Sequence, residues 1–182
     1  MTTSAIELFA VGTQTPNAAL RAAVEGLAPQ YNATVSETGT DVNIDLPIEQ
    51  LRPFVREAKE QYKLRLDFLR NISGVDFGDD GRALKYHLYS FKLGHCLQIT
   101  VPLPPYENPH TVVPSIVALH PGANWMEREA MEMFGIDFEG HPNPKNLLIE
   151  EDLHIHPLLK AHPLQKVELK QGIEDGPAGY KF

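Results

Sequence analysis

The chain has 182 residues, an apolar content of 42%, a formal net charge of −8 and a pI near 5.4. This length and apolar content predict one domain with a single packed core. The acidic balance argues against nucleic acid as a partner, because phosphate binding needs clustered Lys and Arg. No apolar run is as long as the roughly 18 residues of a membrane span, and the N-terminus lacks the pattern of a signal peptide. The single cysteine, Cys96, excludes an internal disulfide and fits a reducing, cytosolic compartment.

The first predicted elements are one helix and a β-hairpin. Residues 1–14 carry no clear pattern, so we expect a weakly ordered N-terminus there. Residues 16–27 predict a helix, because Pro16 suits a first turn and three apolar residues share one face, namely Leu20, Val24 and Leu27. Residues 31–36 and 42–46 predict two strands, joined by a turn over residues 37–41.

A second helix and a three-stranded meander are predicted next. Residues 47–62 place apolar side chains at helical spacing. Three alternating segments predict strands over residues 64–76, 84–91 and 95–101, joined by compact turns. Helices interspersed with hairpin-linked strands predict an α+β fold, with a mostly antiparallel sheet and the helices packed on one face. We expect residues 15–140 to form this domain.

A proline-rich connector over residues 102–109 leads to a predicted pair of helices, over residues 112–119 and 124–134. The second helix carries signals at both ends. Asn124 is predicted as its N-cap and Glu127 as the capping-box carboxylate. Gly135 offers the positive φ that ends a helix.

This second helix has one apolar and one charged face. The apolar face carries Ala123, Met126, Ala130, Met133 and Phe134, and the outward face carries Trp125, Arg128, Glu129 and Glu132. Arg128 and Glu132 are expected to pair at i,i+4. Because Trp and Arg often anchor interfaces, we expect Trp125, Arg128 and Glu129 to contact a partner.

After residue 140 the chain is rich in proline and loses regular periodicity. Its first part is a strap over residues 141–148, HPNPKNLL. The segment is too apolar for a disordered tail, because it carries Leu147, Leu148, Ile149, Leu153, Ile155, Leu158, Leu159 and Leu164. We therefore expect residues 141–182 to form an extended docking arm that lies along another protein.

Signals for catalysis or metal binding are weak. Glu127, Glu129 and Glu132 could act as an acid–base group, but capping and ion pairing account for Glu127 and Glu132. Four histidines lie in the C-terminal part of the chain, His141, His154, His156 and His162, but they lack the paired spacing of zinc sites. All of them except His154 precede a proline, which favours extended backbone over metal coordination. Cys96 falls within a predicted strand, where free cysteines are mostly small buried apolar residues. Without a dinucleotide, P-loop or iron–sulfur motif, the sequence favours a binding module that holds no cofactor or metal of its own.

The helix and the strap together carry a family resemblance. The series Glu127-Arg128-Glu129, Glu132, His141, Lys145 and Leu147-Leu148 resembles the signature of the 30 kDa subunit, also called the C subunit, of NADH:quinone oxidoreductase (respiratory complex I). Further similar segments lie at residues 86–90, 101–103, 113–117 and 121–125, and the resemblance covers residues 30–165. Four places depart from the family pattern. Met131-Glu132 replaces an aromatic residue followed by Asp, and Lys145-Asn146 replaces a basic pair. Asp152-Leu153 stands at the usual acidic–Trp step, and residues 156–160, HPLLK, stand at the later charged His-Pro-Leu segment.

The resemblance implies a non-catalytic subunit in the peripheral arm of a proton-translocating complex, beside the large 49 kDa-type subunit that helps to form the quinone pocket. It implies FMN and iron–sulfur clusters in partner subunits, none in this chain, and a place on the cytoplasmic face of the cell membrane. The departures leave open an equivalent subunit of a membrane-bound hydrogenase or of a ferredoxin- or F420-dependent complex. The residues expected to touch the neighbouring subunit are Trp125, Arg128, Glu129, His141, Pro142, Lys145, Leu147 and Leu148.

Overall fold

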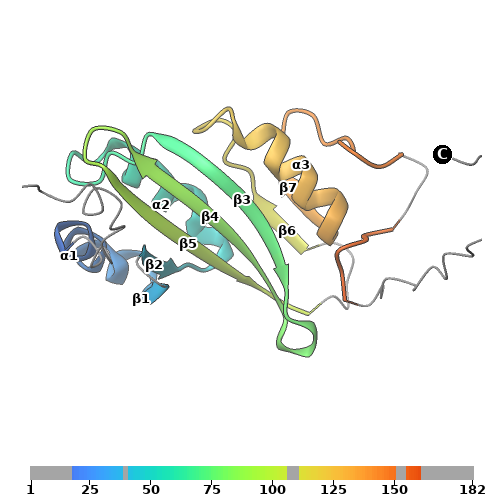
Figure 1. Ribbon diagram of the computed structural model, residues 1–182, viewed down its shortest axis with the longest axis horizontal. Coiled ribbons are helices and arrows are strands. Elements are labelled where there is room, and N and C mark those ends of the chain that lie inside the picture. Colours follow the sequence, from blue (N-terminus) through green and yellow to red (C-terminus); the bar gives the residue numbers. More distant parts are fainter. Residues whose placement is uncertain (1–17, 39–40, 106–110, 151–154, 161–182) are drawn as a thin grey trace, which may run out of the picture.

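A five-stranded sheet forms the main body of the protein, as seen in a computed structural model that describes residues 18–38, 41–105, 111–150 and 155–160 (Figure 1). Its strands stand in the order β1-β2-β5-β4-β3. They are β1 (Thr34–Thr38), β2 (Asp41–Asp45), β3 (Phe68–Asp76), β4 (Arg82–Ser90) and β5 (His95–Leu103). All neighbours are antiparallel except β2 and β5, which run parallel. The predicted α+β class, the first hairpin and the meander are confirmed.

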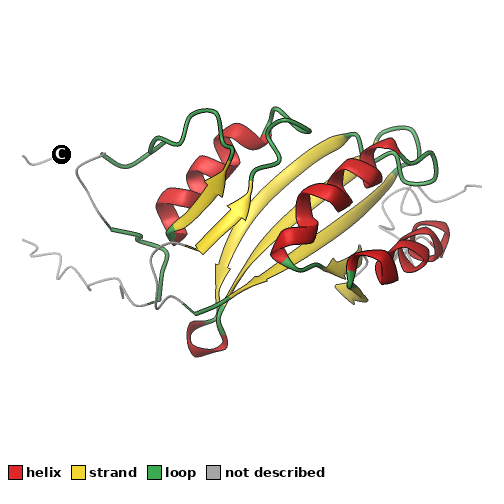
Figure 2. Ribbon diagram, turned by 180° about the vertical axis from the view of Figure 1, so that it is seen from behind, coloured by secondary structure: helices red, strands yellow, loops and turns green. Residues whose placement is uncertain are grey.

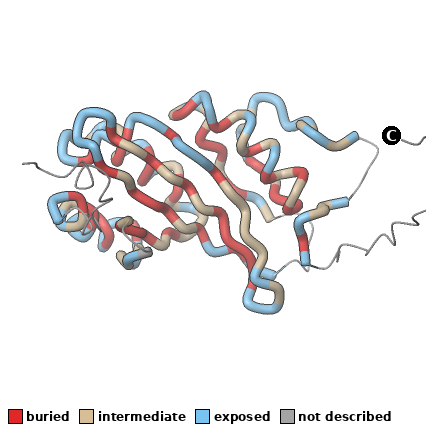
Figure 3. Tube along the Cα trace, in the orientation of Figure 1, coloured by how far each residue is buried: buried red, intermediate tan, exposed pale blue. Residues whose placement is uncertain are grey.

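One face of this sheet is covered by α2 (Leu51–Glu60), which follows a short 3-10 turn over Ile48–Gln50 (Figure 2). The helix α1 (Ala18–Leu27) packs beside the first hairpin and buries the three predicted apolar residues Leu20, Val24 and Leu27. Alternate residues of β4 and β5 form the centre of the core, which is visible as a buried stripe along both strands (Figure 3). These residues are Leu84, Tyr86, Leu88, Leu97, Ile99 and Val101.

A second, smaller unit is a β-α-β crossover. It consists of β6 (Thr111–Pro114), α3 (Ala123–Phe134) and β7 (Ile136–Glu139), and the two strands pair in parallel. The predicted helix over residues 112–119 is therefore wrong, because Val112 and Val113 are strand residues and tight turns follow them. The strand β7 was not predicted. Each of these strands pairs with the other across the intervening helix α3, and such a distant pairing cannot be seen in a local sequence pattern.

The segment before β3 also differs from the prediction. Leu64 and Leu66 are fully buried as expected, but they lie in a hydrogen-bonded turn and the strand begins only at Phe68. Arg65 between them has a φ of +43°, which is not a strand conformation. The alternation of apolar and polar residues over 64–67 therefore arises from two leucines that face the core from a turn, and not from a strand.

Arg82 and Gly74 join the crossover unit to the main sheet. The buried guanidinium of Arg82 donates to the carbonyl oxygens of Phe134 at 2.6 Å, Gly135 at 3.4 Å and Pro104 at 3.2 Å. It also donates to the hydroxyl of Thr111 at 2.6 Å. Gly74 of β3 lies under the ring of Phe134, so closely that a Cβ at this position would stand 2.3 Å from a ring carbon. The fold thus packs α3 against β3, an edge strand of the main sheet.

Candidate partner-docking site

The helix α3 begins earlier than predicted, and Asn124 is not its N-cap. The cap residue is Gly122, without a side-chain bond, and the N–H groups of Ala123 and Asn124 already donate to His120 and Pro121. The preceding turn thus supplies the cap that a side chain was expected to provide. The prediction for the other end is confirmed, because Gly135 has a φ of +61° and its N–H bonds to Met131 at 3.0 Å.

Glu127 lies inside the protein rather than at a capping box. Its side chain is 0% exposed, and Oε1 accepts a hydrogen bond from the N–H of Ile116 at 2.7 Å. Burial raises the pKa of Glu127, against the opposing effect of hydrogen bonds from Ser115 and Ile116. The carboxylate therefore fixes the loop that precedes α3, and its expected role as a cap was wrong.

Replacing Glu127 with Gln should change the pH dependence of stability. A carboxyl whose pKa is raised on folding loses stability as the pH rises above its unfolded value of 4.5, because the native state holds the proton more tightly. His120 acts in the opposite direction, since burial lowers its pKa from 6.5 to about 4 and stability falls as the pH drops through that range. Urea unfolding between pH 4.5 and 6.5 should therefore show a steeper rise of stability with pH in the Gln variant. An unchanged slope would contradict this assignment.

Glu132 is also buried, and it holds the strap. Its carboxylate accepts hydrogen bonds from three successive backbone N–H groups, of Leu147 at 2.8 Å, Leu148 at 3.0 Å and Ile149 at 3.3 Å. The expected ion pair with Arg128 is absent from these contacts, and Glu132 does not lie on the outward face. A carboxylate is well suited to this position because it accepts several amide bonds at once.

The other contacts of the strap come from Arg128 and His141. Arg128 donates from Nε to the carbonyl of Lys145 at 2.7 Å and from Nη2 to that of Asn146 at 2.6 Å. His141 donates from Nε2 to the carbonyl of Asn124 at 3.1 Å, and its Nδ1 accepts from the N–H of Asn143 at 3.0 Å. Residues of α3 thus bind both ends of residues 141–148 and hold this irregular segment in one conformation.

Replacing Glu132 with Gln should loosen the strap. The amide keeps one acceptor oxygen but presents an N–H group to backbone donors, so at least one charge-assisted bond is lost, at a cost of about 2 kcal/mol. Amide exchange at Leu147 and Leu148 should become faster while exchange in β4 and β5 is unchanged. The variant Glu129→Gln, on the exposed part of the same helix, is the matched control and should leave both regions as they were.

Two large apolar side chains remain exposed beside this network. Trp125 is 67% exposed on α3, and Leu148 is 68% exposed on the strap. Glu129, Pro142 and Lys145 are exposed as well. Arg128, His141 and Leu147 are half-buried, and the first two are used to hold the strap. The structure therefore brings all eight predicted contact residues onto α3 and the strap, in two roles: five face solvent and three support them.

A later part of the expected docking arm packs against α3 of its own chain. The N–H of Leu158 donates to the carbonyl of Met133 at 3.2 Å, and His156 donates from Nδ1 to the carbonyl of Glu132 at 2.8 Å. Leu159 is buried, whereas Ile155 and Leu158 are exposed. From the sequence these two exposed residues were expected to belong to the docking arm, but they were not among the eight predicted contact residues. The rest of the arm, residues 151–154 and 161–182, lies outside the described residues.

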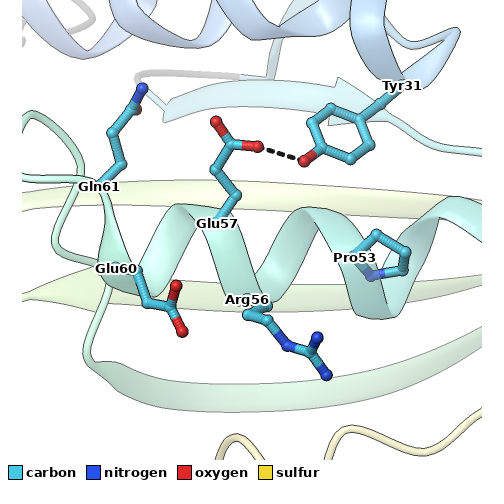
Figure 4. Close-up of a pocket in the computed structure, with 6 residues that line it drawn as sticks. All are labelled: Tyr31, Pro53, Arg56, Glu57, Glu60 and Gln61. Atoms are coloured by element: carbon cyan, nitrogen blue, oxygen red, sulfur yellow. Dashed lines mark hydrogen bonds between the residues drawn. The ribbon is translucent and has the colours of Figure 1, made fainter.

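The described residues include a separate hollow of ≈510 Å³ beside α2. It is lined by Tyr31, Pro53, Arg56, Glu57, Glu60 and Gln61. The hydroxyl of Tyr31 donates to Glu57, and desolvation together with that carboxylate raises the pKa of Tyr31 to about 12. Arg56 and Glu60 point to the opposite side of the helix (Figure 4). The polar groups do not converge on one point, so this hollow is a weaker candidate than the surface on α3.

Two properties of the described part of the chain bear on its class. No helix there is long and apolar enough to cross a membrane. No group of three or more His, Cys, Asp or Glu side chains lies there in a position to hold a metal ion. Of the four histidines considered for zinc, His154 and His162 lie outside the described residues.

Comparison with known proteins gives one consistent family. Residues 44–168 match the family described as the 30 Kd subunit of respiratory-chain NADH dehydrogenase. A relative from Roseiflexus castenholzii, named as the C subunit of NADH-quinone oxidoreductase, is 37% identical over 84% of this chain and 87% of its own length. The protein of the same name from Moorella thermoacetica is 38% identical over 70% of this chain and 84% of its own length. A third, from Nocardioides sp., is 36% identical over 75% of this chain, but this chain covers only 56% of that protein.

A solved structure shows the same fold at lower identity. It is that of the membrane-bound sulfane sulfur reductase, an archaeal respiratory membrane complex, with a TM-score of 0.69 and 21% identity over 88% of this chain. The fold, the signature on α3 and the strap, and the relatives from NADH-quinone oxidoreductases all point to the same assignment. The chain belongs to the family of the 30 kDa subunit of respiratory-chain NADH dehydrogenase.

Proposed function

We propose that this chain is a non-catalytic subunit in the peripheral arm of a complex I-like NADH:quinone oxidoreductase. Electron transfer from NADH to quinone and the coupled proton translocation belong to the assembled complex. The names of the relatives support this placement, since they are subunits of NADH-quinone oxidoreductases. They favour NADH as the electron donor over the hydrogenase-type and ferredoxin- or F420-dependent alternatives.

The docking surface in this proposal is formed by α3 and the strap, and its partner is the large 49 kDa-type subunit beside the quinone site. The observation that carries the proposal is that Glu132 fixes an irregular strap while Trp125 and Leu148 stay about two-thirds exposed beside it. A strap held by buried hydrogen bonds loses little conformational entropy on binding, and exposed Trp residues are frequent interface anchors. FMN and iron–sulfur clusters are expected in partner subunits, and the whole assembly on the cytoplasmic face of the cell membrane.

Replacing Trp125 with Ala should leave this chain folded and weaken its incorporation into the complex. Loss of one buried anchor at an interface weakens binding by about 2 kcal/mol or more, which is roughly thirtyfold. The measurement is the amount of this chain relative to the other subunits after purification of the complex in mild detergent. Phe77→Ala is the matched control, because Phe77 is an exposed aromatic residue in the turn after β3, outside this surface.

Arg128→Ala should affect the strap as well as incorporation, since the Arg128 guanidinium donates hydrogen bonds to the strap. Incorporation should fall together with protection of the strap from amide exchange. If both Trp125→Ala and Arg128→Ala are incorporated normally, α3 and the strap are not part of the interface and this docking proposal is wrong.

A further inference from the structure

The end of the main sheet that lies away from α3 carries a positive net charge, although the chain as a whole is acidic. Two loops meet there, the α2–β3 loop and the β4–β5 turn (Figure 1). We call residues 61–70 and 91–95 the basic end. They contain four bases, Lys63, Arg65, Arg70 and Lys92, and one acid, Asp67, which gives a net charge of +3 in a chain of net charge −8. Such a local reversal attracts an acidic partner.

Buried contacts fix both loops of the basic end. Leu64 and Leu66 are fully buried, so the alternate residues Lys63 and Arg65 face solvent. His95 donates from Nε2 to the carbonyl of Leu64 at 2.8 Å and thereby ties the two loops together. The single acid, Asp67, lies within hydrogen-bond reach of the N–H of Phe91 at 3.5 Å. The bases are therefore presented by loops that need little reordering on binding, which lowers the entropic cost of an encounter.

The basic end also borders an apolar groove. The groove measures ≈520 Å³ and is lined by Ala19, Ala22, Ala23, Tyr62, Lys63 and Leu93. The alanines of α1 leave room for an incoming side chain. Tyr62 is 74% exposed and Phe91 is 69% exposed, and the Phe91 ring packs against those of Phe68 and Tyr89 with centroids 5.0 and 5.4 Å away. Of these aromatic residues Tyr62 lines the groove itself, and an exposed aromatic residue beside a basic rim is typical of a protein interface.

We propose that the basic end docks an acidic segment of a neighbouring subunit. An apolar side chain of that segment occupies the groove, and its carboxylates lie against Lys63, Arg65 and Lys92. An anionic membrane surface also attracts bases and aromatic residues, but a flat surface would leave the groove unfilled. This chain would then contact neighbours at both ends, through α3 and the strap and through the basic end. The inference rests on the proposed function in that the chain is assembled with other subunits.

The test is photo-crosslinking within the purified complex. The photoreactive residue p-benzoylphenylalanine is placed at position 91 and, as the matched control, at position 77, where an exposed aromatic residue stands at the other end of β3. We expect the position 91 probe to cross-link a segment of another subunit that contains several Asp or Glu residues, and the position 77 probe not to cross-link that segment. The double variant Lys63→Glu and Lys92→Glu should lower the cross-link yield about tenfold at low ionic strength. Lys160→Glu at the far end of β3 changes the charge by −2, against −4 for the double variant, and should leave the yield unchanged.

Three results would overturn the inference: cross-linking at position 91 to lipid or to a segment without acidic residues, no cross-link at all, or a yield that the charge reversals leave unchanged. Arg65→Asn is a further variant for the same assay, since Asn tolerates the positive φ at this position and only the charge is removed. If this chain is absent from the purified complex, the proposed function fails and the inference fails with it. If the chain is present but position 91 cross-links nothing, the proposed function stands and only the basic end is excluded.

Discussion

Replacing Arg82 with Met should destabilise the protein by about 3 kcal/mol or more. Three backbone carbonyls, of Phe134, Gly135 and Pro104, accept hydrogen bonds from its guanidinium, and Arg82 is only 2% exposed. Methionine fills a similar volume but donates nothing, so the variant leaves buried acceptors without their donor, at about 1–3 kcal/mol for each group. Urea unfolding followed by circular dichroism measures the loss.

Amide exchange should show where the Arg82 variant is weakened. We expect faster exchange in α3 and β7 than in β2 and β5, because Arg82 joins the crossover unit to the main sheet. Lys85→Met on the same strand is the matched control, since its half-exposed side chain stands on the other face of β4, and a change within about 0.5 kcal/mol is expected. Equal losses in the two variants would show that Arg82 does not hold the two units together.

Replacing Gly74 with Ala should destabilise the protein by about 1–3 kcal/mol, the usual range for overpacking. A Cβ at this position would stand 2.3, 2.5 and 2.7 Å from three atoms of the Phe134 ring, so the ring or the strand must move. Shortening the ring should relieve the conflict. The double variant Gly74→Ala with Phe134→Leu should therefore lose less stability than the sum of the two single variants, by at least about 0.5 kcal/mol.

The control for Gly74 is Gly26→Ala in α1. A Cβ at Gly26 meets no atom within 4 Å, and the residue lies in a helix, where Ala is preferred to Gly by about 0.5–1 kcal/mol. A small gain in stability is expected there, in contrast to the loss at Gly74. Additive effects of Gly74→Ala and Phe134→Leu would contradict the assigned contact.

The main sheet was predictable because its signals are local. Apolar and polar residues alternate along β4 and β5, and the turn at Lys92–Gly94 lies directly between these strands. One continuous stretch of sequence therefore contains every signal needed to predict the meander. The C-terminal end of α3 is equally local, since Gly135 supplies the positive φ on its own. The strands β6 and β7 were missed because, among the residues that the structure describes, they pair with each other across α3.

The acids of α3 were misread for the same reason. The donors to Glu127 and Glu132 are backbone N–H groups from segments 11 to 17 residues away, which i,i+3 and i,i+4 reasoning does not reach. One signal was available in the case of Glu127. It stands between Ala123 and Ala130 at helical spacing, so it falls in the middle of the apolar face, where a carboxylate must have a buried donor. No such signal identified the hydrogen bonds that Arg128 makes to the strap.

The parallel pairing of β2 with β5 has a consequence for the synthesis of the chain. The first hairpin ends at Asp45, but the strand that covers its inner edge ends at Leu103, 58 residues later. At roughly 5–20 residues per second, a ribosome needs about 3–12 s to make that stretch. Until then Val42 and Ile44 lie on an open strand edge, which is the form that most readily pairs with other chains. The N-terminal hairpin is therefore the part of this protein that we expect a ribosome-associated chaperone to protect.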